Sequence, residues 1–190
     1  MNKTITLLAI FSGLPIATYA ETLTLDPDHT HVRFAIGHMG TSTNHGGFYN
    51  LTGELNYDRA AKTGAINLII PMSSLDTNTK AFNEHLLSKD FFNAAKYPTA
   101  TFTSTQWHFD KDKVTQVDGN LTLLGKTRPI SLTATNFNCY FNFILKKPAC
   151  GGDFVTTIDR SQWGIDKYVG LGIPKEVTLN IQVEGSHKAK

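Results

Sequence analysis

Seven histidines are the residues of this chain that could most directly hold a metal ion. His29 and His31 are two apart, so on a strand they would project from the same face. His38 and His45 could approach each other only if the glycine-rich loop between them folded back. Zinc needs three or four converging ligands with further hydrogen-bond support, whereas separate polar positions at strand ends and in loops account for the same histidines. The pattern predicts no metal site and leaves open whether His29 and His31 bind a metal.

Two motifs of nucleotide-binding and hydrolytic enzymes are incomplete. Gly125-Lys126-Thr127 resembles the end of a P-loop, but that motif needs a glycine where this chain has Asn120. Pro129 and a strand pattern follow instead of a helix, which predicts a hairpin turn. There is no Gly-x-Ser-x-Gly sequence, and no spacing singles out a catalytic pair of carboxylates. The sequence therefore predicts no catalytic residue, no cofactor and no enzyme activity.

Cys139 and Cys150 are the only cysteines of the chain. Redox thiols typically have a Cys-x-x-Cys spacing or a partner histidine and base, and neither is evident here. An oxidising compartment would favour pairing them. We expect a structural disulfide that stabilises the fold by about 3 kcal/mol through loop closure, with a redox role as the alternative.

Alternation of apolar and polar residues with a period of two dominates the chain and predicts strands. Turn signals separate the runs at residues 58–64, 110–113, 125–127 and 151–152. About eight short strands predict a mainly β, up-and-down antiparallel barrel rather than a parallel α/β sheet. The cleanest alternating positions are Val32, Phe34, Ile36, Leu51, Leu55, Ile66, Leu68, Ile70, Leu121, Leu123, Val177, Leu179, Ile181 and Val183.

One long connection breaks this alternation. Phe82, Leu86 and then Phe91-Phe92 recur at helical spacing within residues 77–96, and residues 76–79 offer N-caps. This segment predicts a short helical lid or plug.

The first 20 residues have the order of a signal peptide. Lys3 precedes an uncharged, mostly apolar run at residues 5–11, and Gly13, Pro15 and the small residues around Ala20 follow. The run is too short to span a bilayer; a buried N-terminal strand of a cytoplasmic protein is the alternative. We expect a signal peptide at residues 1–20, cleavage after Ala20, one domain at residues 21–190, and a periplasmic location. No cysteine follows the expected cut, so a lipoprotein anchor is not indicated.

The charge of the expected mature chain argues against nucleic acid. Removing Lys3 from the 18 basic residues leaves 17 against 16 acidic residues, a formal net charge of +1. Neither sign forms a patch typical of nucleic-acid binding. We therefore expect no nucleic-acid partner.

A series of distinct short sequence motifs, called phrases below, follows in a fixed order from residue 26 to the end. Together they resemble the YceI-like family of secreted bacterial lipid-binding proteins, over essentially the whole mature chain. The resemblance implies a lipocalin-like, eight-stranded antiparallel barrel that holds a long isoprenoid chain. The segment at residues 136–150 matches no family phrase; a disulfide-closed hairpin there could reshape the cavity mouth. The phrases are Asp26-Pro27-Asp28-His29-Thr30, Gly37-His38-Met39-Gly40-Thr41-Ser42, Gly46-Gly47-Phe48, His85-Leu86-Leu87-Ser88-Lys89-Asp90-Phe91-Phe92, Tyr97-Pro98-Thr99-Ala100-Thr101-Phe102, Gly119-Asn120-Leu121-Thr122-Leu123-Leu124-Gly125 and Ile158-Asp159-Arg160-Ser161-Gln162-Trp163-Gly164.

Alternation and the resemblance together suggest which side chains would contact such a ligand. Arg160 stands where the family pattern has an arginine, beside Trp163, although a strand-end arginine is more often an exposed ion-pair partner. The expected apolar lining is Phe34, Ile36, Phe48, Phe82, Phe91, Phe92, Phe102, Leu121, Leu123 and Trp163. The head-group candidates are His38, Asn44, Lys89 and Arg160.

The expected function is that of a periplasmic carrier or binding protein for a polyisoprenoid lipid, such as an isoprenoid quinone or a polyprenyl pyrophosphate. An eight-stranded barrel can equally pack solid, so a non-catalytic adaptor or stress-response protein with a filled interior is one alternative. An enzyme that uses the barrel as its pocket is another. A homodimer and a transient contact with a membrane or a membrane redox protein remain open, as do the identity of the lipid and the pathway.

Overall fold

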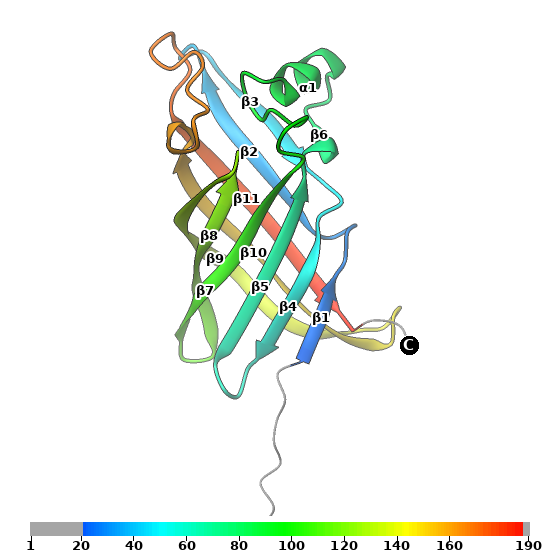
Figure 1. Cartoon of the computed structure of the whole chain (residues 1–190). Coiled ribbons are helices and arrows are strands. Elements are labelled where there is room, and N and C mark those ends of the chain that lie inside the picture. The colour runs from blue at the N-terminus through cyan, green and yellow to red at the C-terminus, as the bar shows by residue number, and fades with distance from the viewer. Residues whose placement is uncertain (1–20, 188–190) are drawn as a thin grey trace, which may run out of the picture.

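The computed structural model describes residues 21–187, and within them eleven strands form one antiparallel sheet (Figure 1). The expected signal peptide and its cleavage point after Ala20 lie outside the described residues. No helix in this described part is long and apolar enough to cross a membrane. The strands are β1 (Glu21–Leu25), β2 (His31–His38), β3 (Ser42–Phe48), β4 (Thr52–Asp58), β5 (Thr63–Pro71), β6 (Leu75–Asp76), β7 (Thr99–Asp110), β8 (Lys113–Leu123), β9 (Lys126–Asn142), β10 (Lys147–Asp159) and β11 (Glu176–Ser186). The helices are α1 (Lys80–Leu87) and the 3-10 turns η1 (Met72–Ser74) and η2 (Arg160–Trp163).

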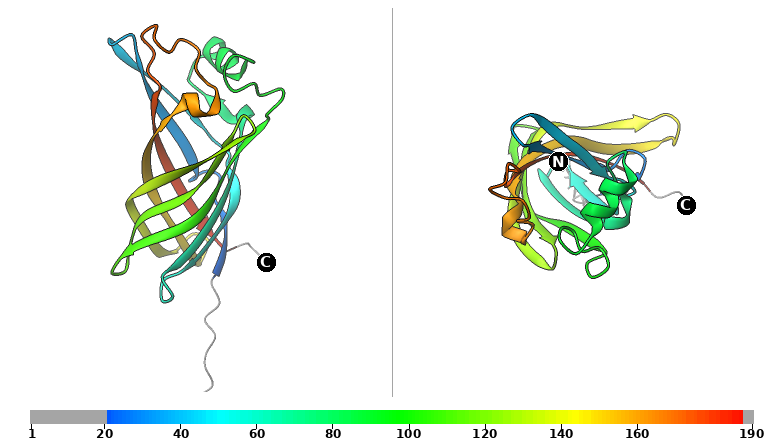
Figure 2. Two further views of the ribbon diagram at one scale, coloured as in Figure 1. Left: turned by 60° about the vertical axis from the view of Figure 1, so that its left-hand side comes forward. Right: turned by 90° about the horizontal axis from the view of Figure 1, so that it is seen from above.

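Eight of these strands close into a ring, which confirms the predicted barrel. The order around the ring is β1-β4-β5-β7-β8-β9-β10-β11, and β11 returns to β1 through the pairs Thr24↔Ser186 and Leu25↔Gly185. The view from above shows the closed wall (Figure 2). Closure leaves the strands of the ring without a long free edge, which removes a common route to aggregation.

The three other strands extend the wall at the end that carries α1. Beyond its pairing with β1, β11 pairs with β2 over residues 178–182. β2 then pairs with β3, and β3 with β6, which follows β5 through η1. β2, β3 and β6 therefore complete the wall where β1 and β4 have ended.

Thr30 joins the two ladders on β11. Its side chain is fully buried, and its hydroxyl donates to the backbone carbonyl of Glu184 (3.1 Å) and accepts from the backbone N–H of the same residue (3.2 Å). Glu184 lies between the residues of β11 that pair with β1 and those that pair with β2. The threonine side chain thus gives the Glu184 N–H an acceptor at the break, while the Glu184 carbonyl also accepts from the Asp26 N–H (2.8 Å).

Side chains alternate inward and outward along the ring, so the apolar positions form the core. Leu51 and Leu55 are completely buried. The ring of Phe102 lies over Gly119 on the adjacent strand, where a Cβ would come within 2.4 Å of the ring. A glycine at that position lets a large side chain lie flat across the inside of the barrel.

Gly151-Gly152 is not the turn that the sequence suggests; both residues lie inside β10. A Cβ on Gly151 would stand 2.3 Å from the Val183 carbonyl oxygen, and one on Gly152 would stand 2.3 Å from the Asn136 carbonyl oxygen. The pair sits beside a register shift after Asp153. These glycines permit close strand contact at an irregular point in the ladder rather than a change of chain direction.

The predicted helical lid is present but shorter than residues 77–96. α1 begins after Thr79, whose side chain makes no capping hydrogen bond, and ends at Leu87. Beyond it the N–H of Phe92 donates to the Leu86 carbonyl and that of Ala94 to the Leu87 carbonyl. The chain then runs in turns, with Asn93 in the left-handed region at φ 44°, so helical spacing alone overstated the length of the helix.

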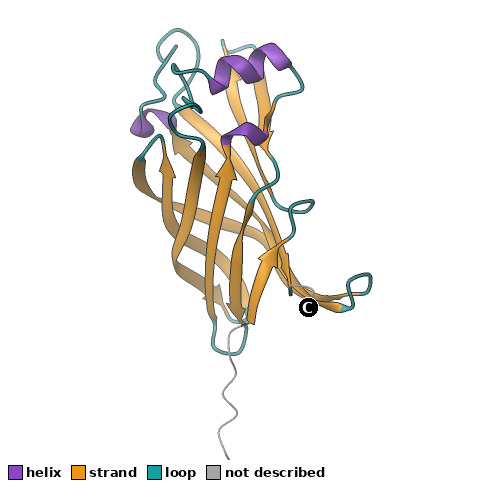
Figure 3. Cartoon of the chain, turned by 45° about the vertical axis from the view of Figure 1, so that its right-hand side comes forward, coloured by secondary structure: helices purple, strands orange, loops and turns teal. Residues whose placement is uncertain are grey.

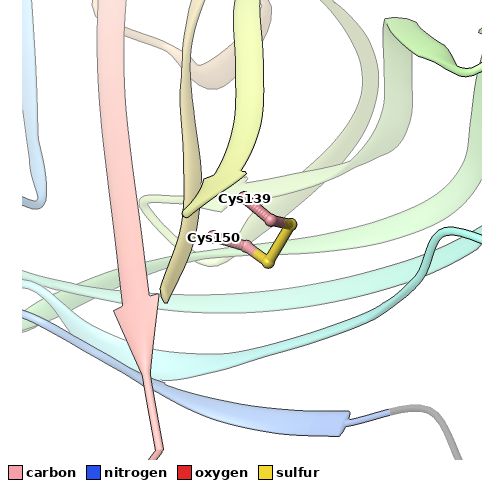
Figure 4. Close-up of a disulfide and its surroundings, with 2 residues drawn as sticks. All are labelled: Cys139 and Cys150. Atoms are coloured by element: carbon pink, nitrogen blue, oxygen red, sulfur yellow. A yellow bond between two sulfur atoms is a disulfide. The ribbon is translucent and has the colours of Figure 1, made fainter. Parts of the chain in front are cut away.

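Cys139 and Cys150 form the predicted disulfide (Figure 4). They are directly paired across the β9–β10 hairpin, with Cα atoms 4.0 Å apart. The end of this hairpin extends beyond the barrel wall, away from α1 (Figure 3). The segment at residues 136–150 is therefore a disulfide-closed hairpin.

Replacing both cysteines by alanine should lower the free energy of unfolding by about 3 kcal/mol, because the bridge restricts the unfolded chain over a separation of 11 residues. Denaturant unfolding of the double variant and of the oxidised parent measures the difference, with the reduced parent as control. A difference near zero would mean that the bridge constrains only a segment that unfolds independently of the barrel.

Candidate functional site

A cavity of about 290 Å³ lies inside the α1 end of the barrel. Its wall comes from β2, β3, β5, β7, β8, β10 and β11, and its cover comes from residues 82–92 and from the loop at residues 165–173. Figures 1 and 2 show these two segments above the same end of the barrel. We call this covered end the mouth. The lining is Val32, Phe34, Ile36, His38, Asn44, Phe48, Ile70, Met72, Phe82, His85, Leu86, Phe91, Phe92, Ala100, Leu121, Leu123, Ile158, Arg160, Ile165, Tyr168, Ile173, Val177 and Leu179.

Eight of the ten predicted apolar lining residues surround this cavity. Strand alternation brings in those on β2, β3 and β8, and the covering segment supplies the lid aromatics. Phe48 and Phe92 meet edge to face, with ring centroids 5.3 Å apart, which connects the wall to the cover. The eight are Phe34, Ile36, Phe48, Phe82, Phe91, Phe92, Leu121 and Leu123.

Phe102 and Trp163 point inward but do not line the cavity. Phe102 lines a much smaller void of about 10 Å³ deeper in the barrel, while its cross-strand partner Leu121 lines the cavity. Trp163 is buried in η2, and its indole N–H donates to the Leu121 carbonyl (3.2 Å). Alternation identifies the inward face of a strand, but it does not say at which height of the barrel a side chain meets the cavity.

The four head-group candidates have different environments. His38 and Asn44 line the cavity from β2 and β3. Lys89 is exposed and does not line it. The fold therefore brings only some of the four predicted head-group residues to the cavity.

Arg160 borders the cavity, but its guanidinium is already engaged. It donates to the carbonyls of Pro174 (3.0 Å), Ile165 (2.7 Å) and Lys167 (3.0 Å). Burial lowers the pKa of this guanidinium from its ordinary value. Arg160 is thus neither the exposed ion-pair partner that is usual at a strand end nor a free anion ligand; it holds the covering loop in place.

Two polar lining residues were not identified from the sequence. His85 lies on α1, with its ring centroid 4.7 Å from that of Phe91 and 6.3 Å from that of Tyr168. Its spacing of three from Phe82 would have placed it on the lid's inner face. Tyr168 lies in the irregular loop after η2, where no periodicity marks an inward residue.

The two covering segments contact each other across the mouth. The ring centroids of Phe91 and Tyr168 are 6.1 Å apart, and the Lys167 ammonium lies 3.1 Å from the Asp90 carboxylate. That hydrogen bond raises the pKa of Lys167, but both side chains are about half exposed, so the pair contributes little stability. This ion pair therefore holds the two covering segments together only weakly.

The chemistry of the lining suits an apolar ligand with a small polar end. The titratable side chains in the lining are His38, His85, Arg160 and Tyr168, and no carboxylate is among the lining residues.

Of the four histidines considered for a metal, His38 lines the cavity, and the other three lie in different surroundings. His45 is exposed on β3, next to the inward-facing Asn44, and the His31 ring packs against Tyr49 at 5.6 Å. His29 lies with Asp26 and Glu184, whose ligand atoms are within 4.8 Å of one another. The Nδ1 of His29 is 2.9 Å from the Asp26 carboxylate, and this hydrogen bond raises the pKa of the imidazole.

The depth of the cavity can be tested by truncating two aromatic rings. Phe102→Ala should lower the free energy of unfolding by about 3–5 kcal/mol, because this ring packs in the closed part of the core. Phe92→Ala should cost less, because its half-buried ring borders space that exists already. Denaturant unfolding of the two delipidated variants beside the parent measures both. Equal losses would contradict the division between a packed and an open part of the barrel.

Comparison with known proteins agrees with this architecture. The family model described as the YceI-like domain matches residues 23–185. A protein named UPF0312 from Pseudomonas savastanoi pv. phaseolicola is 34% identical over 199 residues, with 99% of each chain covered. Protein YceI of Escherichia coli O157:H7 is 41% identical over 107 residues, which is 56% of each chain.

Solved structures share the fold. BcnA of Burkholderia cenocepacia superposes with a TM-score of 0.71 at 23% identity, covering 84% of this chain and 98% of that one. The YceI protein of Campylobacter jejuni gives 0.69 at 25%, with 78% and 87% covered. A polyisoprenoid-binding domain from Saccharophagus degradans, implicated in plant cell wall breakdown, gives 0.63 at 15%, with 90% and 100% covered. On the match over residues 23–185 and the full-length relatives, the chain belongs to the YceI-like family.

Proposed function

We propose that this protein binds and carries a long-chain polyisoprenoid lipid, with the isoprenoid tail inside the barrel and the polar head at the mouth. The observation that carries the proposal is the cavity of about 290 Å³, whose lining is apolar except for a few polar groups. Small-molecule sites typically combine an apolar wall with a few placed polar groups. That a protein of the same fold is described as polyisoprenoid-binding supports the choice of ligand class.

The cavity would enclose only part of such a ligand. Its volume is at the low end of the range for ligand sites. Enclosing about ten carbons of a tail of roughly forty would stabilise the complex by on the order of 8 kcal/mol relative to water, at about 0.8 kcal/mol per buried CH₂ group. A bilayer solvates the same tail equally well, so transfer from membrane to barrel is close to neutral. The polar contacts at the mouth then decide which lipid is accepted.

The mouth favours an uncharged, carbonyl-bearing head such as a quinone over a pyrophosphate. Its polar side chains include His38, Asn44, His85 and Tyr168, which can donate hydrogen bonds without carrying a fixed charge. Arg160, the cationic side chain of the lining, is engaged by three backbone carbonyls. A pyrophosphate carries more than one negative charge and would meet only this one cation in the described lining, with three of its five N–H groups already donating to carbonyls.

Binding rather than catalysis is the role we infer. The described lining contains no carboxylate, and its two histidines stand on different elements without a hydrogen bond to an orienting acid in the described contacts. General acid–base catalysis needs such groups positioned on the reacting atoms. The family relationship points the same way, because a related fold is described by what it binds.

The binding proposal is tested by filling the cavity. Ala100 is a small lining residue on β7, and Ala100→Phe should occupy the space of the tail; Thr101→Phe, the next residue on the outer face, is the matched control. Native mass spectrometry of protein purified from its own compartment should show an isoprenoid adduct on the parent and the control, and its loss from Ala100→Phe. An unmodified mass for the parent would contradict the proposal, as would equal retention by both variants.

We also propose that the protein acts in the periplasm after removal of residues 1–20, as the charged, apolar and small residues of that segment suggest. Intact-mass measurement of the protein from native cells should give a chain that begins at Glu21. A mature species that retains Met1 would overturn the proposal of export, while leaving the binding proposal to its own test.

A further inference from the structure

The end of the β9–β10 hairpin exposes an unusual run of apolar side chains. Phe143 is 84% and Ile144 91% exposed, and Phe141 and Leu145 are each close to half exposed. We call residues 141–147 the hairpin tip. Figures 1 and 3 show it projecting past the barrel wall, at the end opposite α1. A continuous exposed apolar run on a soluble domain marks a site of contact with a partner or a membrane.

We propose that the hairpin tip inserts into the surface of a phospholipid bilayer that contains anionic lipids. The order of its side chains fits this role. The most exposed residues, Phe143 and Ile144, lie at the turn and would reach deepest. Tyr140 stands behind them on β9, where an amphipathic ring would sit at the level of the head groups.

The positive charge of the tip is opposite to that of the proposed anionic membrane surface. Residues 141–147 include Lys146 and Lys147 and no acidic residue. Lys146 is exposed and can place its ammonium group among lipid phosphates. The Lys147 ammonium lies 3.4 Å from the His187 backbone carbonyl, a long contact that an anionic phosphate can replace. The carboxylate of Glu184 accepts a hydrogen bond from the Tyr140 hydroxyl (2.5 Å) on the barrel side of the tip. Its charge is therefore set back from the residues that would insert.

The tip is held in shape rather than folded back onto the barrel. The Asn142 side-chain oxygen accepts hydrogen bonds from the backbone N–H groups of Ile144 and Leu145, both at 3.0 Å. The disulfide between Cys139 and Cys150 ties the strands behind it. A preformed apolar turn pays less ordering entropy on binding than a flexible one does.

A bilayer fits this surface better than a protein partner does. A specific protein interface usually involves about 20–30 residues on each side, whereas the exposed apolar run occupies one narrow turn. Insertion into lipid needs no matching pocket and is favoured by a convex, protruding shape. With the tip in a bilayer, the mouth of the cavity would face away from that bilayer. The inference rests on the tip alone and does not depend on which ligand occupies the cavity.

The first test is a tryptophan placed at the tip. The two native tryptophans, Trp107 and Trp163, are buried, so an added indole at an exposed site can be followed by its emission. Ile144→Trp should shift to shorter wavelength when vesicles of equal parts phosphatidylcholine and phosphatidylglycerol are added. Leu171→Trp, at an exposed apolar residue (68%) in the loop at the opposite end, is the control and should not shift. A shift at residue 171 alone would overturn the proposal, because the mouth would then be the membrane-facing end.

The second test measures vesicle binding by sedimentation. Phe143→Ser with Ile144→Ser should reduce vesicle binding by at least about tenfold, because the two apolar side chains that would enter the bilayer are lost. Lys146→Gln with Lys147→Gln should reduce binding to the anionic vesicles by roughly fivefold per lysine and leave the weak binding to pure phosphatidylcholine unchanged. Leu171→Ser is the control and should bind like the parent. All variants are first shown to melt at the parent's temperature.

Three further results would contradict the inference. One is unchanged vesicle binding by the Phe143→Ser, Ile144→Ser variant. Another is a parent that does not bind vesicles at all. The third is a parent that is dimeric in solution and becomes monomeric in that variant, which would assign the tip to a second copy of the chain.

Discussion

β11 pairs along one edge with two successive strands, β1 at one end and β2 at the other, and Thr30 bridges the interval between them. The first pairing closes the eight-stranded ring, and the second begins the extension through β2, β3 and β6. A sheet that ended at β1 would leave the α1 end of the barrel without a complete wall. The fully buried hydroxyl of Thr30 therefore has a structural importance larger than its size, because it accepts the hydrogen bond of the Glu184 N–H in the interval between the two pairings.

The pairing of β11 with both β1 and β2 gives the barrel an interior with two different parts. Around Phe102 and Val117 the side chains fill the barrel and leave a void of only about 10 Å³. Toward α1, the wall is completed by β2 and β3, and the space remains open under the covering segments. The packed part supplies stability without a ligand, so the open part can remain a cavity. A carrier needs both properties, because it must persist while empty and still accept an apolar chain.

Much of this could be predicted from the sequence because strand alternation is a local property. The inward positions on β2, β5, β8 and β11, the eight-stranded closure and the single disulfide follow from period, turn residues and cysteine count. The boundary between the open and the packed part of the barrel falls between Leu121 and Phe102. It could not be predicted, because it depends on how neighbouring strands are staggered. Gly151-Gly152 has the composition of a turn, yet both residues are needed inside a strand for close contact.

The site residues show the same limit. The resemblance marks Arg160 as a head-group candidate, but a sequence does not reveal that three carbonyls of the following loop accept hydrogen bonds from its guanidinium. Tyr168 reaches the cavity from an irregular loop, where there is no period to detect. The sequence predicts a disulfide-closed hairpin at residues 136–150, but only the projection of this hairpin beyond the barrel shows that the apolar residues of its tip have no core to join.

The central claim is that the open part of the barrel holds the tail of an isoprenoid lipid. The most direct measurement is the electron density of crystals grown from protein purified out of native cells without delipidation. Our account predicts one continuous, elongated density that starts beside His38 and His85, runs along the lining and stops at the level of Leu121. An empty cavity, or density confined to the surface outside the covering segments, would contradict it.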